Sequence, residues 1–162
     1  MKDSMFYTLA NEAMHRECRR LCDFTDALDQ TPIKKKENIA EYKCAKYRYA
    51  AISNIHAMLL HSNRLKSRLT NSHYLVAQVD ELFCKHPDLI KGFDAVLEEE
   101  KSDFGLYYGM IVLIEERIEE LTSKTECATD WERVELTERL GGFRFAKECL
   151  EEAWKKRKDG EI

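Results

Sequence analysis

The sequence predicts an all-α protein, and three observations lead to this fold class. Of its 162 residues, 44% are hydrophobic and 35% are charged, with only six glycines and two prolines, which is typical of helical globular proteins. Apolar residues recur at steps of three and four along most of the chain, the period of an amphipathic helix. There is no internal repeat, low-complexity block or interdomain linker. We therefore expect residues 1–162 to form one domain, a single compact bundle of five to six helices.

The first two helices are expected at residues 3–29 and 37–63. The apolar face of the first contains Phe6, Leu9, Ala13, Leu21, Phe24 and Leu28. Thr31-Pro32 ends this helix, because the residue before a proline disfavours the helical conformation. The apolar face of the second contains Ile39, Tyr42, Ala45, Tyr49, Ile52, His56 and Leu59. Polar residues from Asn63 to Ser72 predict a turn after it.

The next helices are expected on either side of Pro87. Ser72 can cap a short helix that runs through Lys85, and Pro87 suits the first turn of a helix that runs to about residue 101. Ser102 or Asp103 then caps a helix with an apolar stripe of Phe104, Tyr107, Ile111, Ile114, Ile118 and Leu121. Residues 88–124 form either one bent helix or two.

A last helix is expected at residues 130–158. Thr129 and Glu132 have the spacing of a capping box at its start. Gly141 and Gly142 interrupt it, at a cost in helix propensity of ~1 kcal/mol each relative to alanine. Such a pair predicts either a kink or a close contact with another helix.

Charge and cysteine content restrict the setting of the protein. The formal net charge of −4 argues against a nucleic-acid partner, which needs a basic surface. The longest apolar run, residues 110–114, is far below the ~20 residues that span a membrane, and the N-terminus lacks a signal-peptide core. The six cysteines are scattered through helical patterns. We expect a soluble intracellular protein without membrane contact or cofactor, with reduced and mostly buried thiols.

The segment around Pro87 carries the most specific resemblance. Its residues Val79, Leu82, Phe83, His86, Pro87, Asp88, Leu89, Ile90, Gly92, Phe93 and Leu97 stand in a helix–proline–helix pattern. This pattern resembles the third and fourth helices of the paired amphipathic helix domain of eukaryotic transcriptional corepressors. In that family four helices form a cleft that takes up an amphipathic helix from a repressor. The resemblance implies core or partner-binding roles for Val79, Leu82, Phe83, Leu89, Ile90 and Phe93.

The rest of the chain departs from that family pattern. The first two helices of the family are separated by a short turn, whereas residues 37–63 predict one uninterrupted helix. The proline that usually follows the final leucine is replaced by Glu98 after Leu97. The alternative interpretation is a helix–proline–helix corner reached independently of the family.

The end of the chain carries a second, stylistic likeness. Residues 128–150, which contain the capping box and the closing helix, look like the endings of many small accessory proteins encoded in phage genomes. Such proteins usually act by binding other proteins.

Two constellations on the first helix suggest metal chemistry. His15, Cys18 and Cys22 stand three and four residues apart, so one helix face could present them to a soft metal such as Zn²⁺. No fourth ligand is evident, and neighbours in a core have the same spacing. Glu12 and His15 have the Glu-x-x-His form of di-iron bundles, but no second such motif occurs.

One further pattern suggests catalysis. Arg68 and His73 fit the Arg-x4-His pattern of the HEPN-type ribonucleases, although Leu69 replaces the polar residue that usually follows the arginine. His56 lies on an apolar face and is expected to be a hydrogen-bonded core histidine. His61 and His86 are expected to flank helix ends.

We interpret the sequence as a non-enzymatic helical interaction protein, an adaptor, scaffold or inhibitor that presents a helical face or groove to a protein partner. Self-association is compatible with this interpretation. A phage or mobile-element protein of virion assembly or host takeover is its first specific form. A corepressor-like module that binds an amphipathic peptide helix is the second hypothesis, and a HEPN-like ribonuclease is the third.

Overall fold

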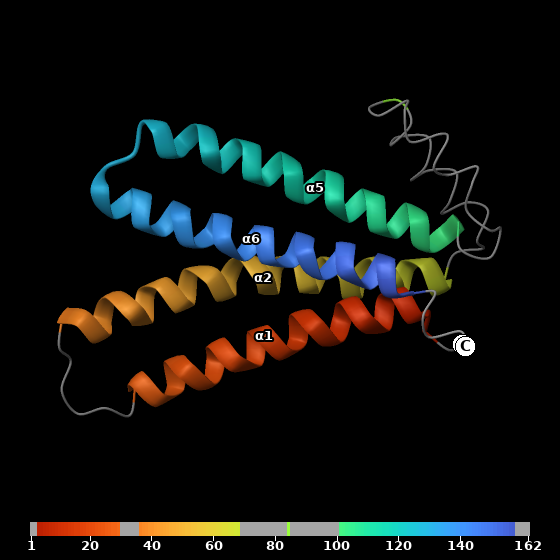
Figure 1. Cartoon of the computed structure of the whole chain (residues 1–162), viewed down its shortest axis with the longest axis horizontal. Helices are drawn as coiled ribbons and strands as arrows, with labels where there is room; N and C mark the ends of the chain where they lie inside the picture. Colours follow the sequence, from red (N-terminus) through yellow and green to blue (C-terminus); the bar gives the residue numbers. More distant parts are fainter. Residues whose placement is uncertain (1–2, 30–35, 69–83, 85–100, 158–162) are drawn as a thin grey trace.

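The computed structural model describes residues 3–29, 36–68, 84 and 101–157 (Figure 1). These residues contain four helices, α1 (Met5–Asp29), α2 (Lys36–Arg68), α5 (Lys101–Glu126) and α6 (Asp130–Lys156), and no strand. The all-α prediction is confirmed. The count differs from the expected five or six, because the helices expected at 72–85 and 87–101 fall almost wholly outside the described residues.

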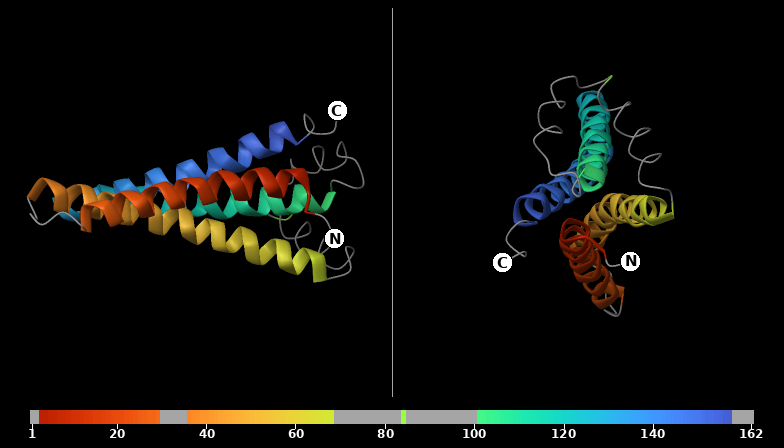
Figure 2. Two further views of the ribbon diagram at one scale, coloured as in Figure 1. Left: turned by 90° about the horizontal axis from the view of Figure 1, so that it is seen from below. Right: turned by 90° about the vertical axis from the view of Figure 1, so that its right-hand side faces the viewer.

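The four helices pack as two antiparallel pairs, α1 with α2 and α5 with α6 (Figure 1). Viewed along the bundle, α2 and α6 lie between α1 and α5 (Figure 2, right). The α2–α6 contact is the most extensive one, and α6 also packs on α1. The interface between α2 and α6 is therefore the centre of the fold.

The glycine pair of α6 makes this central contact possible. A Cβ on Gly142 would lie 2.7 Å from the carbonyl oxygen of Arg48 and 2.8 Å from the Cβ of Ala51. No side chain fits at such distances from α2, so of the two expectations for this pair the close helix contact is confirmed.

An aromatic cluster fills the bundle near the start of α1 and the end of α6. The rings of Tyr107 and Trp154 are stacked with centroids 4.9 Å apart, and the ring of Phe6 meets both edge-on at 5.6 Å. Such pairs add about 0.5–1.5 kcal/mol each beyond the apolar area that they bury. The cluster ties α1, α5 and α6 together at the end where α2 and α6 diverge (Figure 2, left).

A polar contact joins the beginnings of α1 and α5. The Ser4 hydroxyl accepts a hydrogen bond from the backbone N–H of Tyr7 at 3.2 Å, which caps α1. The same hydroxyl donates to Oδ1 of Asp103 at 3.0 Å. The prediction that Ser102 or Asp103 caps the helix was wrong, because α5 already begins at Lys101 and Asp103 is buried in its first turn.

The second helix runs past its predicted end to Arg68. Asn63 was expected to begin a turn, but its Nδ2 donates to Oδ1 of Asp3 at 3.1 Å, so its amide contacts the start of α1. His61 consequently lies inside α2 and not at a helix end. None of the helices in the described part of the chain is long and apolar enough to cross a membrane.

The last helix begins as predicted. The Glu132 carboxylate accepts a hydrogen bond from the backbone N–H of Thr129 at 3.2 Å, as the capping box requires. This start places Trp131 in the first turn of α6.

Candidate protein-interaction site

The residues predicted to meet a partner lie outside the described residues. These are Val79, Leu82, Phe83, Leu89, Ile90 and Phe93, together with the corner at Pro87. Their roles remain predictions. The same holds for His73 and His86, whereas Arg68 is the last residue of α2.

The end of α2 that leads toward this segment is anchored in the bundle. Leu59 is fully buried, whereas the neighbouring Met58 is 36% exposed. The two side chains thus divide α2 here into a face that packs in the core and a face that a partner can reach.

A histidine contact fixes this part of α2 against α1. Nε2 of His56 lies 2.6 Å from Oδ1 of Asn11, which confirms the hydrogen bond expected of this core histidine, although its side chain is only half-buried. The His15 ring lies beside it, with centroids 6.0 Å apart. Burial lowers the pKa of His56, and the charge of His15 lowers this pKa further.

The thiols predicted as possible metal ligands are embedded in helix packing. Cys18 is buried, and burial raises its pKa to about 11. Hydrogen bonding with the Cys22 thiol raises the pKa of Tyr49. The described part of the chain contains no group of three or more His, Cys, Asp or Glu side chains arranged to hold a metal ion. The thiols were expected to be mostly buried, but only Cys18 and Cys149 are buried. Cys22 and Cys44 are half-buried, and Cys84 and Cys127 are exposed.

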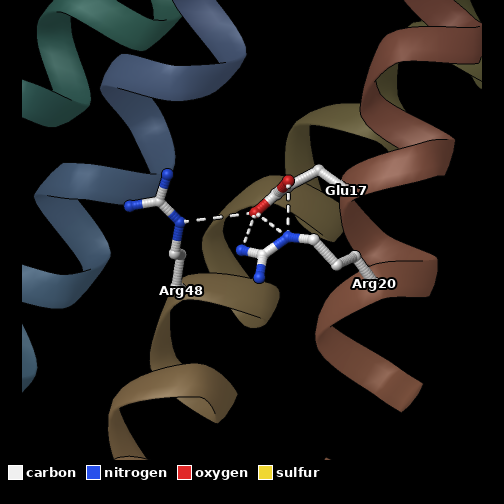
Figure 3. Close-up of polar contacts among 3 residues, drawn as sticks. All are labelled: Glu17, Arg20 and Arg48. Carbon is white, nitrogen blue, oxygen red and sulfur yellow. Dashed lines mark hydrogen bonds and ion pairs between the residues drawn. The ribbon is translucent and has the colours of Figure 1, made fainter. Parts of the chain in front are cut away.

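A charged cluster of Glu17, Arg20 and Arg48 joins α1 to α2 (Figure 3), and Arg48 also meets the glycine pair of α6. The Glu17 carboxylate accepts hydrogen bonds from Nε of Arg20 at 3.2 and 3.1 Å, and it lies 3.8 Å from Nε of Arg48. Hydrogen bonding from Arg20 lowers the pKa of Glu17. The Arg48 guanidinium also lies over the Phe145 ring, 5.5 Å from its centroid. Two arginines hold the Glu17 carboxylate between α1 and α2, and we interpret the cluster as structural.

A groove at the beginnings of α2 and α6 is lined in part by exposed apolar side chains. We call this surface the Trp131 face; its cavity of about 430 Å³ is lined by Ala40, Lys43, Tyr47, Trp131, Glu132, Val134 and Glu135. Trp131 is 73% exposed and Val134 is 42% exposed. The Lys43 Nζ lies 5.5 Å from the centroid of the Trp131 ring, within range of a cation–π contact.

A second groove of about 350 Å³ lies between α1 and α6. Leu9, Ala13 and Phe145 are among its lining residues, with the charged residues Glu12 and Arg16 also along it. Its apolar residues belong to or pack against the main core, so it offers fewer exposed apolar side chains than the Trp131 face.

Sequence reasoning missed the Trp131 face although a signal was present. The capping box fixes Trp131 in the first turn of α6, and a large aromatic residue among acidic neighbours at a helix start is a candidate for exposure. That Ala40 and Lys43 lie opposite it depends on how α2 packs on α6.

A family comparison bears on the segment after Met58. The sequence model of the paired amphipathic helix repeat matches residues 58–97. The match confirms the resemblance found around Pro87 and begins earlier, inside the last turns of α2. No curated protein and no solved structure matches the chain.

Proposed function

We propose that this chain is a non-enzymatic interaction protein whose residues 58–97, the matched segment, take up an amphipathic helix of a protein partner. The observation that carries the proposal is the match of the paired amphipathic helix repeat to this segment. Grooves of this kind bind a helix through apolar side chains spaced i, i+3, i+4 and i+7. Of the two interaction functions expected from the sequence, the corepressor-like one is therefore preferred to a phage role, which no comparison supports.

The geometry of α2 supports this proposal. Leu59 fastens the start of the matched segment to the core, while Met58 stays accessible beside it. A binding element that is anchored on a rigid helix loses less freedom on binding than an isolated one. The four-helix bundle would then serve as the support from which the matched segment meets its partner.

The experiment that tests the proposal is a selection of displayed amphipathic-helix peptides against the full chain. Selected peptides are expected to share the i, i+3, i+4, i+7 apolar spacing, and scrambled versions of the same composition are expected not to bind. Binding should weaken in Met58→Ala. The matched control is Phe24→Ala. Phe24 is a similarly exposed hydrophobic residue, at 40%, but it lies in α1 and outside the matched segment.

Alanine variants of the six residues predicted to meet a partner then distinguish binding residues from core residues. A residue that meets the partner should weaken peptide binding while the melting temperature is preserved, whereas a core residue should lower the melting temperature. The proposal fails if no peptide outperforms its scrambled version. It also fails if Met58→Ala and all six variants bind like wild type.

A further inference from the structure

The Trp131 face exposes apolar side chains to water, and burying them against another molecule would be energetically favourable. Trp131 is the most exposed of the large hydrophobic side chains in the described residues, at 73%. Val134 lies one turn further along the same face of α6 and is also exposed. Tryptophan buries a large area on association and is enriched among the residues that dominate binding energies.

The two walls of the groove differ in charge. The α2 wall carries Lys43, and the α6 wall carries Glu132 and Glu135. Glu135 also pairs with Arg139 one turn further along α6, at 3.0 Å, in a partly exposed contact. Within the described part of the chain, Lys43 contacts the Trp131 ring and forms no ion pair with a carboxylate. Its ammonium group is thus available to a second molecule that brings a negative charge to the α2 wall.

We propose that the Trp131 face joins two copies of this chain about a two-fold axis that runs along the groove. Such an axis sets the α2 wall of each copy against the α6 wall of the other. Lys43 of each copy then faces Glu135 of the other, and each Trp131 covers the apolar α2 wall of the other groove. Every contact occurs twice, as in the two-fold dimers that are commonest among soluble oligomers.

Charge complementarity identifies a second copy as the occupant. One surface supplies a projecting aromatic residue, a groove beside it and both signs of charge, so the surface is complementary to itself. The exposed ion pairs contribute little on their own, and the burial of the two Trp131 rings supplies most of the affinity. This inference does not depend on the proposed function, since the Trp131 face and the matched segment lie toward opposite ends of α2.

The first test is sedimentation equilibrium of the purified full chain over a range of concentrations. Wild type should dimerise, and Trp131→Ala should raise the dimer dissociation constant by about tenfold or more, as loss of a dominant interface residue does. Met5→Ala is the control, because it removes an exposed hydrophobic side chain at the start of α1 that does not line the groove. Circular dichroism checks that both variants keep the helical content of wild type.

The second test exchanges charges across the axis. Lys43→Glu alone sets two carboxylates against each other at each cross-axis pair, and Glu135→Lys alone sets two ammonium groups together, so each variant should dimerise more weakly than wild type. Mixed in equal amounts, the two variants should form a heterodimer, because each of its two cross-axis pairs then joins one ammonium group to one carboxylate. Glu135 is preferred to Glu132, which caps α6.

Three outcomes would overturn the inference: a wild type that stays monomeric at the highest concentration, a Trp131→Ala dimer as tight as wild type, or charge variants that form no heterodimer when mixed. Monomeric wild type would leave the Trp131 face to a foreign partner or to none.

Discussion

Gly142 of α6 sits directly against the backbone of Arg48 in α2. A Cβ at position 142 would approach the Arg48 carbonyl oxygen to 2.7 Å, closer than a carbon and a backbone oxygen can stand without a shift of one helix. At Gly141 the nearest atom to such a Cβ is Nη1 of the same arginine, at 3.1 Å. One glycine therefore faces a fixed backbone and the other faces the end of a flexible side chain.

The two glycines should respond oppositely to alanine. Gly142→Ala should lower the free energy of unfolding by about 1–3 kcal/mol, the usual cost of overpacking. Gly141→Ala should leave it unchanged or raise it by up to ~1 kcal/mol, because alanine favours the helix and the arginine tip can move. Urea denaturation of both variants measures the difference. Equal stability of the two would show that α6 is free to move away from α2.

The sequence predicted the helices better than the faces that they bury. Three of the four helix starts fall within two residues of expectation, because capping residues and the Thr31-Pro32 stop are local signals. Phe24 and Ile39, however, were placed on the apolar faces of their helices and are each 40% exposed. Their positions continue the apolar period, but they lie near the ends of α1 and α2, where the described helices leave them partly exposed. Periodicity identifies a face, whereas burial depends on what packs against it.

Only the part of the candidate site that lies within one continuous segment of the sequence could be predicted. The match at residues 58–97 follows from a sequence pattern around Pro87. The Trp131 face combines residues nearly a hundred positions apart, and it depends on how α2 packs on α6, which approach closely at Gly142. No sequence period encodes that approach.

His56 should make stability depend on pH. Its folded-state pKa lies below the ordinary value of 6.5, through burial and the charge of His15. The unfolded chain therefore binds a proton more readily, and stability should fall as the pH drops below 6.5. Urea denaturation on both sides of that pH should show this slope. His56→Gln should remove most of the slope, and His15→Gln should remove a smaller part, since burial is the larger cause. A slope equal to wild type in His56→Gln would assign it to other groups.

The six cysteines should separate into kinetic classes. We expect six free thiols in denaturant, because their scattered helical positions suggest a reducing compartment. In the folded protein, exposed Cys84 and Cys127 should react first with a thiol reagent. Cys18 and Cys149 should react last, because burial raises the pKa of each to about 11 and leaves little thiolate. Fewer than five free thiols in protein prepared without oxidant would contradict this prediction.

The ribonuclease hypothesis has a direct test. We expect the wild-type protein to leave RNA intact, since Arg68 and His73 match their pattern only loosely. Reproducible cleavage by wild type that disappears in both Arg68→Ala and His73→Ala, with the helical content unchanged, would establish the opposite.

The final prediction concerns the corner at Pro87, where the sequence places Phe83 before the proline and Leu89 after it. A helix usually ends before the residue that precedes proline, which is His86, and restarts with proline in its first turn. The apolar residues on both sides can then close over one another, so we expect Leu82 and Phe83 to be core. Phe83→Ala should accordingly cost ~3–5 kcal/mol of stability. Leu59→Ala calibrates this value, because Leu59 is fully buried and its truncation should cost ~2–5 kcal/mol.

If Phe83 instead lines the groove, its variant should melt within about a degree of wild type and still lose the selected peptide, because a groove residue stays partly in water until the partner covers it. Thermal melts and peptide titrations on the same protein samples separate the two roles.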